Sequence, residues 1–92
     1  MDDPFPEPVE IEITDVFDLH TIPPRDVKRV VEEYLQLAHE KGFRSVRIIH
    51  GKGTGALRER VAEMLRKESR VSSFRLGAWN EGGAGVTVAE LA

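Results

Sequence analysis

The sequence has no cysteine and no long apolar run. Without cysteine, disulfide bridges, thiolate nucleophiles and cysteine-ligated zinc sites are excluded, and a reducing compartment is compatible with the chain. No apolar stretch approaches the roughly 18 residues that span a membrane. The N-terminal residues also lack the basic region that opens a secretory signal. We therefore expect a cytoplasmic domain that has no membrane partner.

Aromatic residues are few as well, and tryptophan and tyrosine occur once each. Apolar residues still make up 40% of the 92 and charged residues 32%, which is typical of one small globular domain. Residues 1–15 carry six acids and no base, whereas residues 16–92 carry ten acids and thirteen bases. We expect an acidic, flexible arm at residues 1–12 and a mildly basic domain at residues 13–92, for which an anionic partner is not excluded.

The spacing of apolar residues predicts two helices and four strands in the order βαβαββ. This order is typical of a small two-layer α/β sandwich, in which both helices pack on one four-stranded mixed sheet. The expected strands run from Ile13 or Val16 to Leu19, from Arg44 to Ile49, from Ser72 to Ala78 and from Val86 to Leu91, and the expected helices begin near Pro24 and at Ala56 and end near Gly42 and Ser69.

A glycine-rich segment, His50-Gly51-Lys52-Gly53-Thr54-Gly55, lies between the second expected strand and the second expected helix. Glycines let the backbone turn sharply and approach a ligand closely, and a helix N-terminus offers unpaired amides and the positive end of its dipole. Both features favour a bound phosphate. The segment also matches the glycine fingerprint of dinucleotide sites, but it follows the wrong strand in a chain too short for that fold. The residues predicted to bind phosphate are Gly51, Lys52, Gly53, Thr54 and Gly55.

Two further polar residues end the first expected strand. One residue separates Asp18 from His20, so in an extended strand their side chains point to the same side, where the acid can orient the histidine for acid–base chemistry. If the first two strands are parallel, this pair shares a sheet edge with His50 and Lys52. The alternative is that Asp18 caps a turn and His20 is an ordinary surface residue.

A divalent metal such as Mn²⁺ or Mg²⁺ is a further alternative at this edge. Asp18, His20 and His50 are all residue types that ligate metals. Their spacing is no recognised metal signature, however. We therefore assign no metal ligand and favour metal-free acid–base chemistry.

A second glycine cluster, Gly82-Gly83-Ala84-Gly85, precedes the last expected strand. Its default interpretation is a hairpin connection, and the functional alternative is a flap that contacts the substrate backbone through Gly82, Gly83 and Gly85. Trp79 comes shortly before the cluster. The burial habits of tryptophan favour a place in the core, whereas an exposed indole could stack on an unpaired base.

Three segments together resemble the Smr (small MutS-related) domain, from about residue 17 to residue 91. The first motif of that family is leucine–aspartate–any–histidine, usually followed by glycine. Here Phe17 stands in place of the leucine and Thr21 in place of the glycine. The segments are Phe17-Asp18-Leu19-His20, Val46-Arg47-Ile48-Ile49-His50-Gly51-Lys52-Gly53-Thr54-Gly55 and Glu81-Gly82-Gly83-Ala84-Gly85-Val86-Thr87-Val88.

The resemblance implies a fold similar to the C-terminal domain of translation initiation factor three. It also implies binding of DNA or RNA, often with endonuclease activity, in DNA recombination and repair or in RNA and ribosome quality control. The motif residues of the family fall on Asp18, His20 and His50, the implied catalytic group, and on Gly51 and Gly53.

Family members occur alone or at the end of a MutS-type ATPase, for which 92 residues leave no room. Some relatives bind nucleic acid without cutting it. One alternative function is therefore a non-catalytic module that binds RNA or the ribosome. Another is a domain that recruits a protein partner through its sheet.

Overall fold

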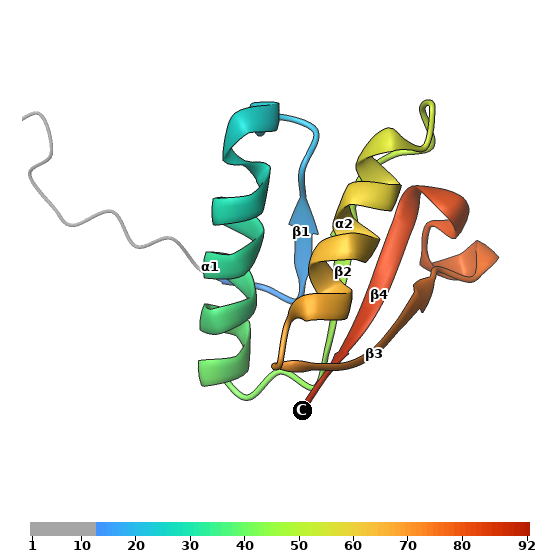
Figure 1. Cartoon of the computed structure of the whole chain (residues 1–92). Coiled ribbons are helices and arrows are strands. Elements are labelled where there is room, and N and C mark those ends of the chain that lie inside the picture. Colours follow the sequence, from blue (N-terminus) through green and yellow to red (C-terminus); the bar gives the residue numbers. More distant parts are fainter. Residues whose placement is uncertain (1–12) are drawn as a thin grey trace, which may run out of the picture.

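The computed structural model describes residues 13–92 (Figure 1). Residues 1–12, on which the expected acidic arm falls, lie outside the described residues. The expected order of elements is confirmed, the last strand has the expected bounds, and the second helix ends two residues earlier than expected. The elements are β1 (Val16–Asp18), a 3₁₀ turn (Pro24–Asp26), α1 (Val27–Glu40), β2 (Ser45–Ile49), α2 (Ala56–Lys67), β3 (Val71–Leu76), two 3₁₀ turns (Trp79–Glu81 and Gly83–Gly85) and β4 (Val86–Leu91).

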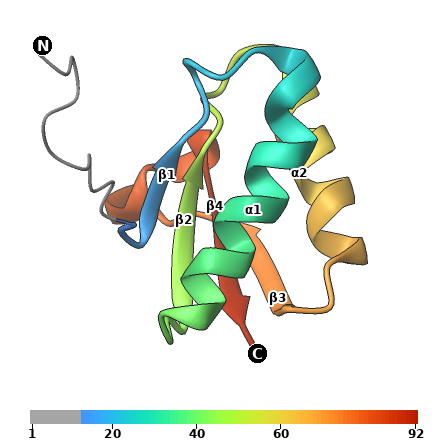
Figure 2. The same cartoon turned by 90° about the vertical axis from the view of Figure 1, so that its left-hand side faces the viewer.

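The four strands form one mixed sheet in the order β1-β2-β4-β3, as expected. β1 pairs with β2 in parallel, whereas β4 is antiparallel to both β2 and β3. Figure 2 shows both helices on the same side of this sheet, so the domain has two layers. In the register of the strands, Asp18 lies beside Ile49 and Ile49 beside Val86. Because side chains alternate along each strand, this row faces away from the helices.

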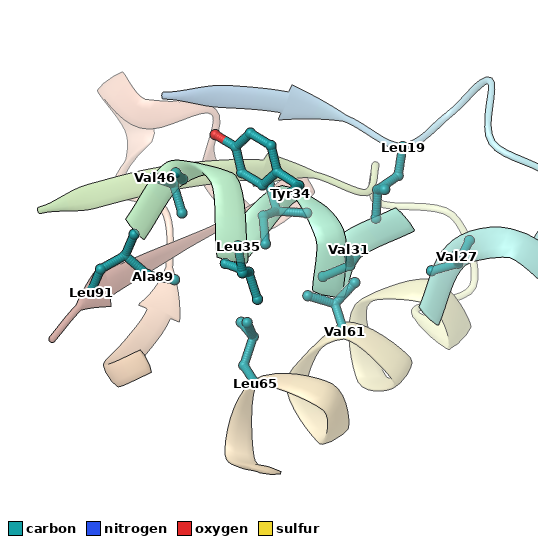
Figure 3. Packing of buried hydrophobic residues seen from close by; sticks show 12 residues of the cluster. Leu19, Val27, Val31, Tyr34, Leu35, Val46, Val61, Leu65, Ala89 and Leu91 are labelled. Atoms are coloured by element: carbon teal, nitrogen blue, oxygen red, sulfur yellow. The ribbon is translucent and has the colours of Figure 1, made fainter. Parts of the chain in front are cut away.

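The core fills the space between the sheet and the helices (Figure 3). Both helices turn the apolar stripe that their spacing predicts towards the core, and each fully buried valine or leucine contributes about 1.5–3 kcal/mol. Leu57 and Met64 of α2 are half-buried rather than buried. Among residues 13–92, neither helix is long and apolar enough to cross a membrane. The largest fully buried side chains belong to Leu19, Val27, Val31, Leu35, Val46, Ile48, Val61 and Leu65.

Tyr34 fastens the short strand β1 to α1. Its ring stacks on the ring of Phe17, with centroids 4.5 Å apart and an interplanar angle of 12°. Its hydroxyl donates a 2.6 Å hydrogen bond to the carbonyl oxygen of Thr14. Burial, with a smaller effect of the nearby Asp15 carboxylate, raises the pKa of Tyr34 to about 12. The aromatic ring and the hydroxyl therefore make separate contributions to the position of β1.

Tyr34→Phe should lower the free energy of unfolding by about 1 kcal/mol, because the carbonyl oxygen of Thr14 loses its donor while the ring stack remains. Tyr34→Ala should lower it by about 3–5 kcal/mol, because the stacked ring is also lost. Urea unfolding of the three proteins measures both effects. Equal losses for the two variants would show that the ring contributes nothing beyond its hydroxyl.

Candidate functional site at the carboxyl edge of β1 and β2

β1 and β2 end side by side at one edge of the sheet. The amide of Leu19 donates a 2.9 Å hydrogen bond to the carbonyl oxygen of Ile49, which continues the parallel pairing to the last residue of β2. The turn after β1 and the glycine-rich segment therefore leave the sheet together, and both lie at the top of the domain in Figure 1. This is the shared edge that a parallel arrangement predicts.

Asp18 and His20 form a hydrogen-bonded pair. One carboxylate oxygen of Asp18, Oδ1, accepts the backbone amide of His20 at 2.9 Å, and Oδ2 lies 3.0 Å from Nδ1 of the His20 ring. A carboxylate only accepts, so Nδ1 carries the proton and Nε2 of the neutral ring is left as an acceptor. The amide of His20, followed by its ring, lowers the pKa of Asp18 below its ordinary value. The side chains of His20 and Asp18 are 74% and 48% exposed, so the pair faces solvent.

The turn that carries this pair forms without glycine at position 21. The amide of Ile22 donates to the carbonyl oxygen of Leu19 at 2.9 Å, closing a four-residue turn with Thr21 inside it. Within residues 13–92 every residue with a positive φ is a glycine. Thr21 therefore adopts an ordinary backbone conformation, and the departure from the family motif does not prevent the turn.

His50 is buried, with 7% of its surface exposed. Its Nδ1 lies 2.9 Å from the carbonyl oxygen of Gly51, and its Nε2 lies 2.8 Å from the hydroxyl oxygen of Thr87. A carbonyl only accepts, so Nδ1 carries the proton, and Nε2 of the neutral ring accepts the hydroxyl of Thr87. Both ring nitrogens are engaged within the protein. The contacts of His50 position the first residue of the glycine-rich segment.

Thr87 is a site residue that the sequence analysis missed. It is 2% exposed and lies on the helix-facing side of β4. A signal was present in the sequence, because Thr87 is the one hydroxyl-bearing residue in the apolar run from Val86 to Ala89. A buried polar side chain needs a hydrogen-bond partner, and here that partner is His50.

The second glycine cluster packs against the first. The carbonyl oxygen of Gly85 accepts hydrogen bonds from the amides of His50, at 3.0 Å, and of Gly51, at 2.9 Å. A Cβ added at Gly85 would lie 3.5 Å from Cα of Gly51 and 3.7 Å from Cγ of Lys52. The expected hairpin connection between β3 and β4 is confirmed, and its last residue is also part of this edge.

Two cationic side chains lie in or beside the glycine-rich segment. Lys52 within the segment is exposed. Gly55, with φ of 86°, precedes α2 in a left-handed conformation that favours glycine, and a Cβ there would lie 2.7 Å from Nη2 of Arg58. The space left by the missing side chain therefore holds the Arg58 guanidinium beside the first turn of α2. Arg58 was not among the residues predicted from the sequence.

A hollow of about 410 Å³ joins the exposed histidine to the start of α2. One wall is the segment that follows β1, and the other is the first turn of α2. The guanidinium of Arg60 closes one side by donating a 2.7 Å hydrogen bond to the carbonyl oxygen of Pro24. His20 and the first turn of α2 thus line the same hollow. The residues that line the hollow are Leu19, His20, Ile22, Pro24, Val27, Ala56, Leu57 and Arg60.

The described residues contain no ready-made metal centre. Among residues 13–92, no three histidine, aspartate or glutamate side chains gather closely enough to hold an ion. Asp18, His20 and His50 therefore do not form the three-ligand set that the sequence left open. The buried ring of His50, with both nitrogens engaged, explains why.

Trp79 does not lie in the core, so that expectation is wrong. It is 91% exposed, on the connection between β3 and β4. The connection is held by other groups: Arg75 donates to both carboxylate oxygens of Glu81, at 2.7 and 3.0 Å, and the amide of Ala78 donates to Oε1 at 2.9 Å. The indole of Trp79 takes no part in these bonds. It cannot pack in the core between the sheet and the helices, because the connection lies on the face of the sheet away from the helices.

These features define a class: a small two-layer α/β domain with a glycine-rich segment before its second helix and an exposed aspartate–histidine pair at one edge of its sheet. The comparisons with known proteins are more specific. The profile of the Smr domain matches residues 17–92, and the chain belongs to this family.

The relatives that it resembles include large proteins. The chain is 57% identical over 83 residues to endonuclease MutS2 of Gemmatimonas aurantiaca and 49% identical over 80 residues to that of Symbiobacterium thermophilum. These matches cover 90% and 87% of this chain but 10% of each relative. The chain therefore spans about a tenth of the length of the curated relatives that it matches.

Solved structures that share the fold include two Smr-type proteins. The Smr domain of Thermus thermophilus MutS2 is 40% identical with a TM-score of 0.79, and the match covers 84% of this chain and 96% of that domain. YdaL, a stand-alone small MutS-related protein from Escherichia coli, is 28% identical with a TM-score of 0.78, over 84% of this chain and 63% of YdaL. The family and the fold that the sequence predicts are both confirmed.

Glu81 should make the stability of the domain sensitive to acid. Arg75, followed by the amide of Ala78, lowers the pKa of Glu81 from 4.5 to about 2 in the folded protein. The stabilisation is therefore fully present above the unfolded-state pKa and is lost as the pH falls from about 4.5 towards 2. Between about pH 6 and pH 3, the urea midpoint should fall less for Glu81→Gln than for the parent.

Glu32→Gln is the matched control, because it removes one negative charge from an exposed position on α1. Its urea midpoint should fall with pH as that of the parent does. An identical acid response of Glu81→Gln and the parent would contradict the role given to the Arg75–Glu81 pair.

Proposed function

We propose that this domain binds nucleic acid at the carboxyl edge of β1 and β2 and cuts its phosphodiester backbone. The observation that carries the proposal is the hollow that His20 shares with the N-terminus of α2. A phosphate held by the helix amides would then lie beside an exposed histidine. Membership of the Smr family, and the word endonuclease in the names of its MutS2 relatives, support the same function.

Binding would depend chiefly on the backbone of the glycine-rich segment. The amides of the segment beyond Gly51, and those of Leu57 and Arg58 in the first turn of α2, would donate to phosphate oxygens, and the dipole of α2 favours an anion there. The amides of Gly51 and Ala56 already donate to Gly85 and to the Thr54 hydroxyl. Lys52 and Arg58 border the segment and would add attraction that salt weakens. The second glycine cluster would contact the backbone of the bound nucleic acid through Gly82, Gly83 and Gly85, since Gly85 lies against the first residues of the segment.

Chemistry would depend on the pair of Asp18 and His20. Asp18 holds the proton of the ring on Nδ1, which leaves Nε2 free to act as a general base. With RNA, Nε2 would take the proton of a 2′-hydroxyl, whose oxygen attacks the adjacent phosphorus. The bond from phosphorus to the 5′-oxygen then breaks, and that oxygen takes up a proton from water. Lys52 would offset the charge that develops on the phosphate.

His50 would act as a positioning residue in this scheme. Its ring hydrogen bonds to Gly51 and Thr87, so its part is to fix the backbone that binds the phosphate. DNA has no 2′-hydroxyl, and its cleavage requires an activated water. For DNA we propose a divalent ion, Mn²⁺ or Mg²⁺, as cofactor, with ligands that come mainly from the phosphates of the substrate.

One observation favours a second candidate, a non-catalytic module that binds RNA or the ribosome. Of the two histidines at this edge, only His20 is exposed, so a second proton-transfer group for the leaving oxygen is not evident. Incubation with labelled single-stranded RNA, duplex DNA and branched DNA separates the two functions. The assay includes EDTA in one arm and added Mn²⁺ or Mg²⁺ in another. Binding without cleavage in every arm would favour the second candidate.

Gly53→Ala should weaken oligonucleotide binding about 10- to 100-fold, the loss expected for one or two charge-assisted hydrogen bonds. In the free protein a Cβ at Gly53 meets nothing within 4 Å, so its obstruction would appear only when a phosphate approaches. Gly42→Ala is the matched control, since Gly42 also has a positive φ, with open space around its missing side chain, and lies beyond α1. Fluorescence anisotropy measures binding, and urea unfolding checks both folds. Equal affinities of the two variants would contradict the placement of the phosphate.

His20→Ala should lower the rate of cleavage about 10²- to 10⁴-fold with little change in affinity, the usual contribution of a general base. Asp18→Asn should act in the same direction, because asparagine has one acceptor oxygen for two donors, the backbone amide and Nδ1 of His20. His39→Ala removes an exposed histidine at the end of α1 and should cleave as the parent does. Single-turnover cleavage and anisotropy in one buffer give the comparison. Parallel losses of affinity and rate would make His20 a binding residue only.

A further inference from the structure

Trp79 is the one tryptophan of the chain, and its indole is 91% exposed. Indole rings are usually well buried, because each carries a large apolar surface. The backbone that presents this ring is firmly held. In addition to the Arg75–Glu81 pair, the amide of Gly83 donates to the carbonyl oxygen of Ala78 at 2.9 Å. The ring is therefore displayed from an ordered turn.

The turn that carries Trp79 lies on the same face of the sheet as Asp18. Figure 2 shows the connection between β3 and β4 on the side of the sheet away from the helices. A Cβ added at Gly82 would overlap Cγ2 of Val86, so this part of the connection lies directly over Val86. Val86 belongs to the row that runs through Ile49 to Asp18. Val86 and Asp18 lie two strand spacings apart, which is about 10 Å.

The same connection leads directly into the phosphate-binding edge. Its last residue, Gly85, hydrogen bonds to His50 and Gly51. Charge on this face has no positive excess: Arg75 is paired with Glu81, the exposed Arg47 and Asp18 carry opposite signs, and the exposed Glu90 adds an acid. A nucleic-acid strand that extends from the glycine-rich segment over this face would therefore gain little from charge. The feature that could hold it there is the flat apolar surface of Trp79.

We propose that Trp79 stacks on an unpaired base of the nucleic acid whose phosphate is bound at the glycine-rich segment. The inference rests on the proposed function and narrows its ligand. Bases inside an intact duplex are already stacked on their neighbours, so the ligand has at least one unpaired nucleotide next to the bound phosphate. Single-stranded segments, loops and opened junctions belong to this class, and a continuous duplex does not.

The lone tryptophan makes a direct test possible, because all tryptophan emission comes from residue 79. Single-stranded RNA and DNA oligonucleotides, and the duplexes of the same sequences, are titrated into the protein. Tryptophan emission and the anisotropy of a label on the oligonucleotide are recorded together. The single strands should quench the emission in step with binding, whereas the duplexes should leave it nearly unchanged.

Trp79→Ala should weaken binding of the single strand about 5- to 150-fold, the range of base–aromatic stacking. Trp79→Phe keeps a ring and should recover part of that loss. The duplex affinity of both variants should match that of the parent. Leu37→Ala, which truncates another exposed apolar side chain on α1, is the matched control and should change neither affinity.

Two outcomes overturn the stacking while leaving the proposed function intact. In the first, the parent binds single strands without a loss of tryptophan emission, and Trp79→Ala binds them as tightly as the parent does. The other is an emission that shifts with protein concentration alone and ignores the oligonucleotide, which would make Trp79 a contact between copies of the chain. If the parent binds neither single strands nor duplexes at low salt, the proposed function itself fails and the stacking fails with it.

Discussion

Buried His50 joins the glycine-rich segment, β4 and the second glycine cluster. Its carbonyl-bound nitrogen fixes Gly51 at the start of the glycine-rich segment, and its other nitrogen is tied to Thr87 on β4. The amide of His50 is in turn bound to Gly85 at the end of the second glycine cluster. One residue therefore aligns the loop after β2 with the loop before β4. A phosphate site made of backbone amides depends on this alignment, because amides cannot adjust their direction as side chains do.

The parallel pairing of β1 with β2 supplies the other half of the arrangement. It brings the Asp18–His20 pair to the edge where the glycine-rich segment begins. Had β1 been antiparallel to β2, its carboxyl end would lie at the opposite edge of the sheet. The connection through α1 makes the parallel arrangement possible, and the Tyr34 contacts hold the short strand to that helix.

The elements of the fold follow from local patterns, and so does the position of the glycine-rich segment. Apolar periodicity reports which face of a helix meets the core, and it located α1, α2 and all four strands. Contacts distant in sequence were beyond this reasoning. Thr87 lies 37 residues from His50, and Arg58 reaches its place only because Gly55 leaves room there. The exposure of Trp79 depends on how a whole connection folds over the sheet, and residue preference alone pointed to the core.

The two histidines of the edge have different roles because their burial and hydrogen-bond partners differ. His20 is exposed and bound to an acceptor on one nitrogen, which leaves the other nitrogen open to a substrate. His50 is buried and bound on both nitrogens, so it shapes the backbone and has no nitrogen left for a substrate. Their places in the fold explain the difference. His20 follows a carboxylate in a solvent-facing turn, whereas His50 continues β2 and turns inward to a hydroxyl. A histidine in a motif therefore indicates a site, and its burial and partners decide what it can do there.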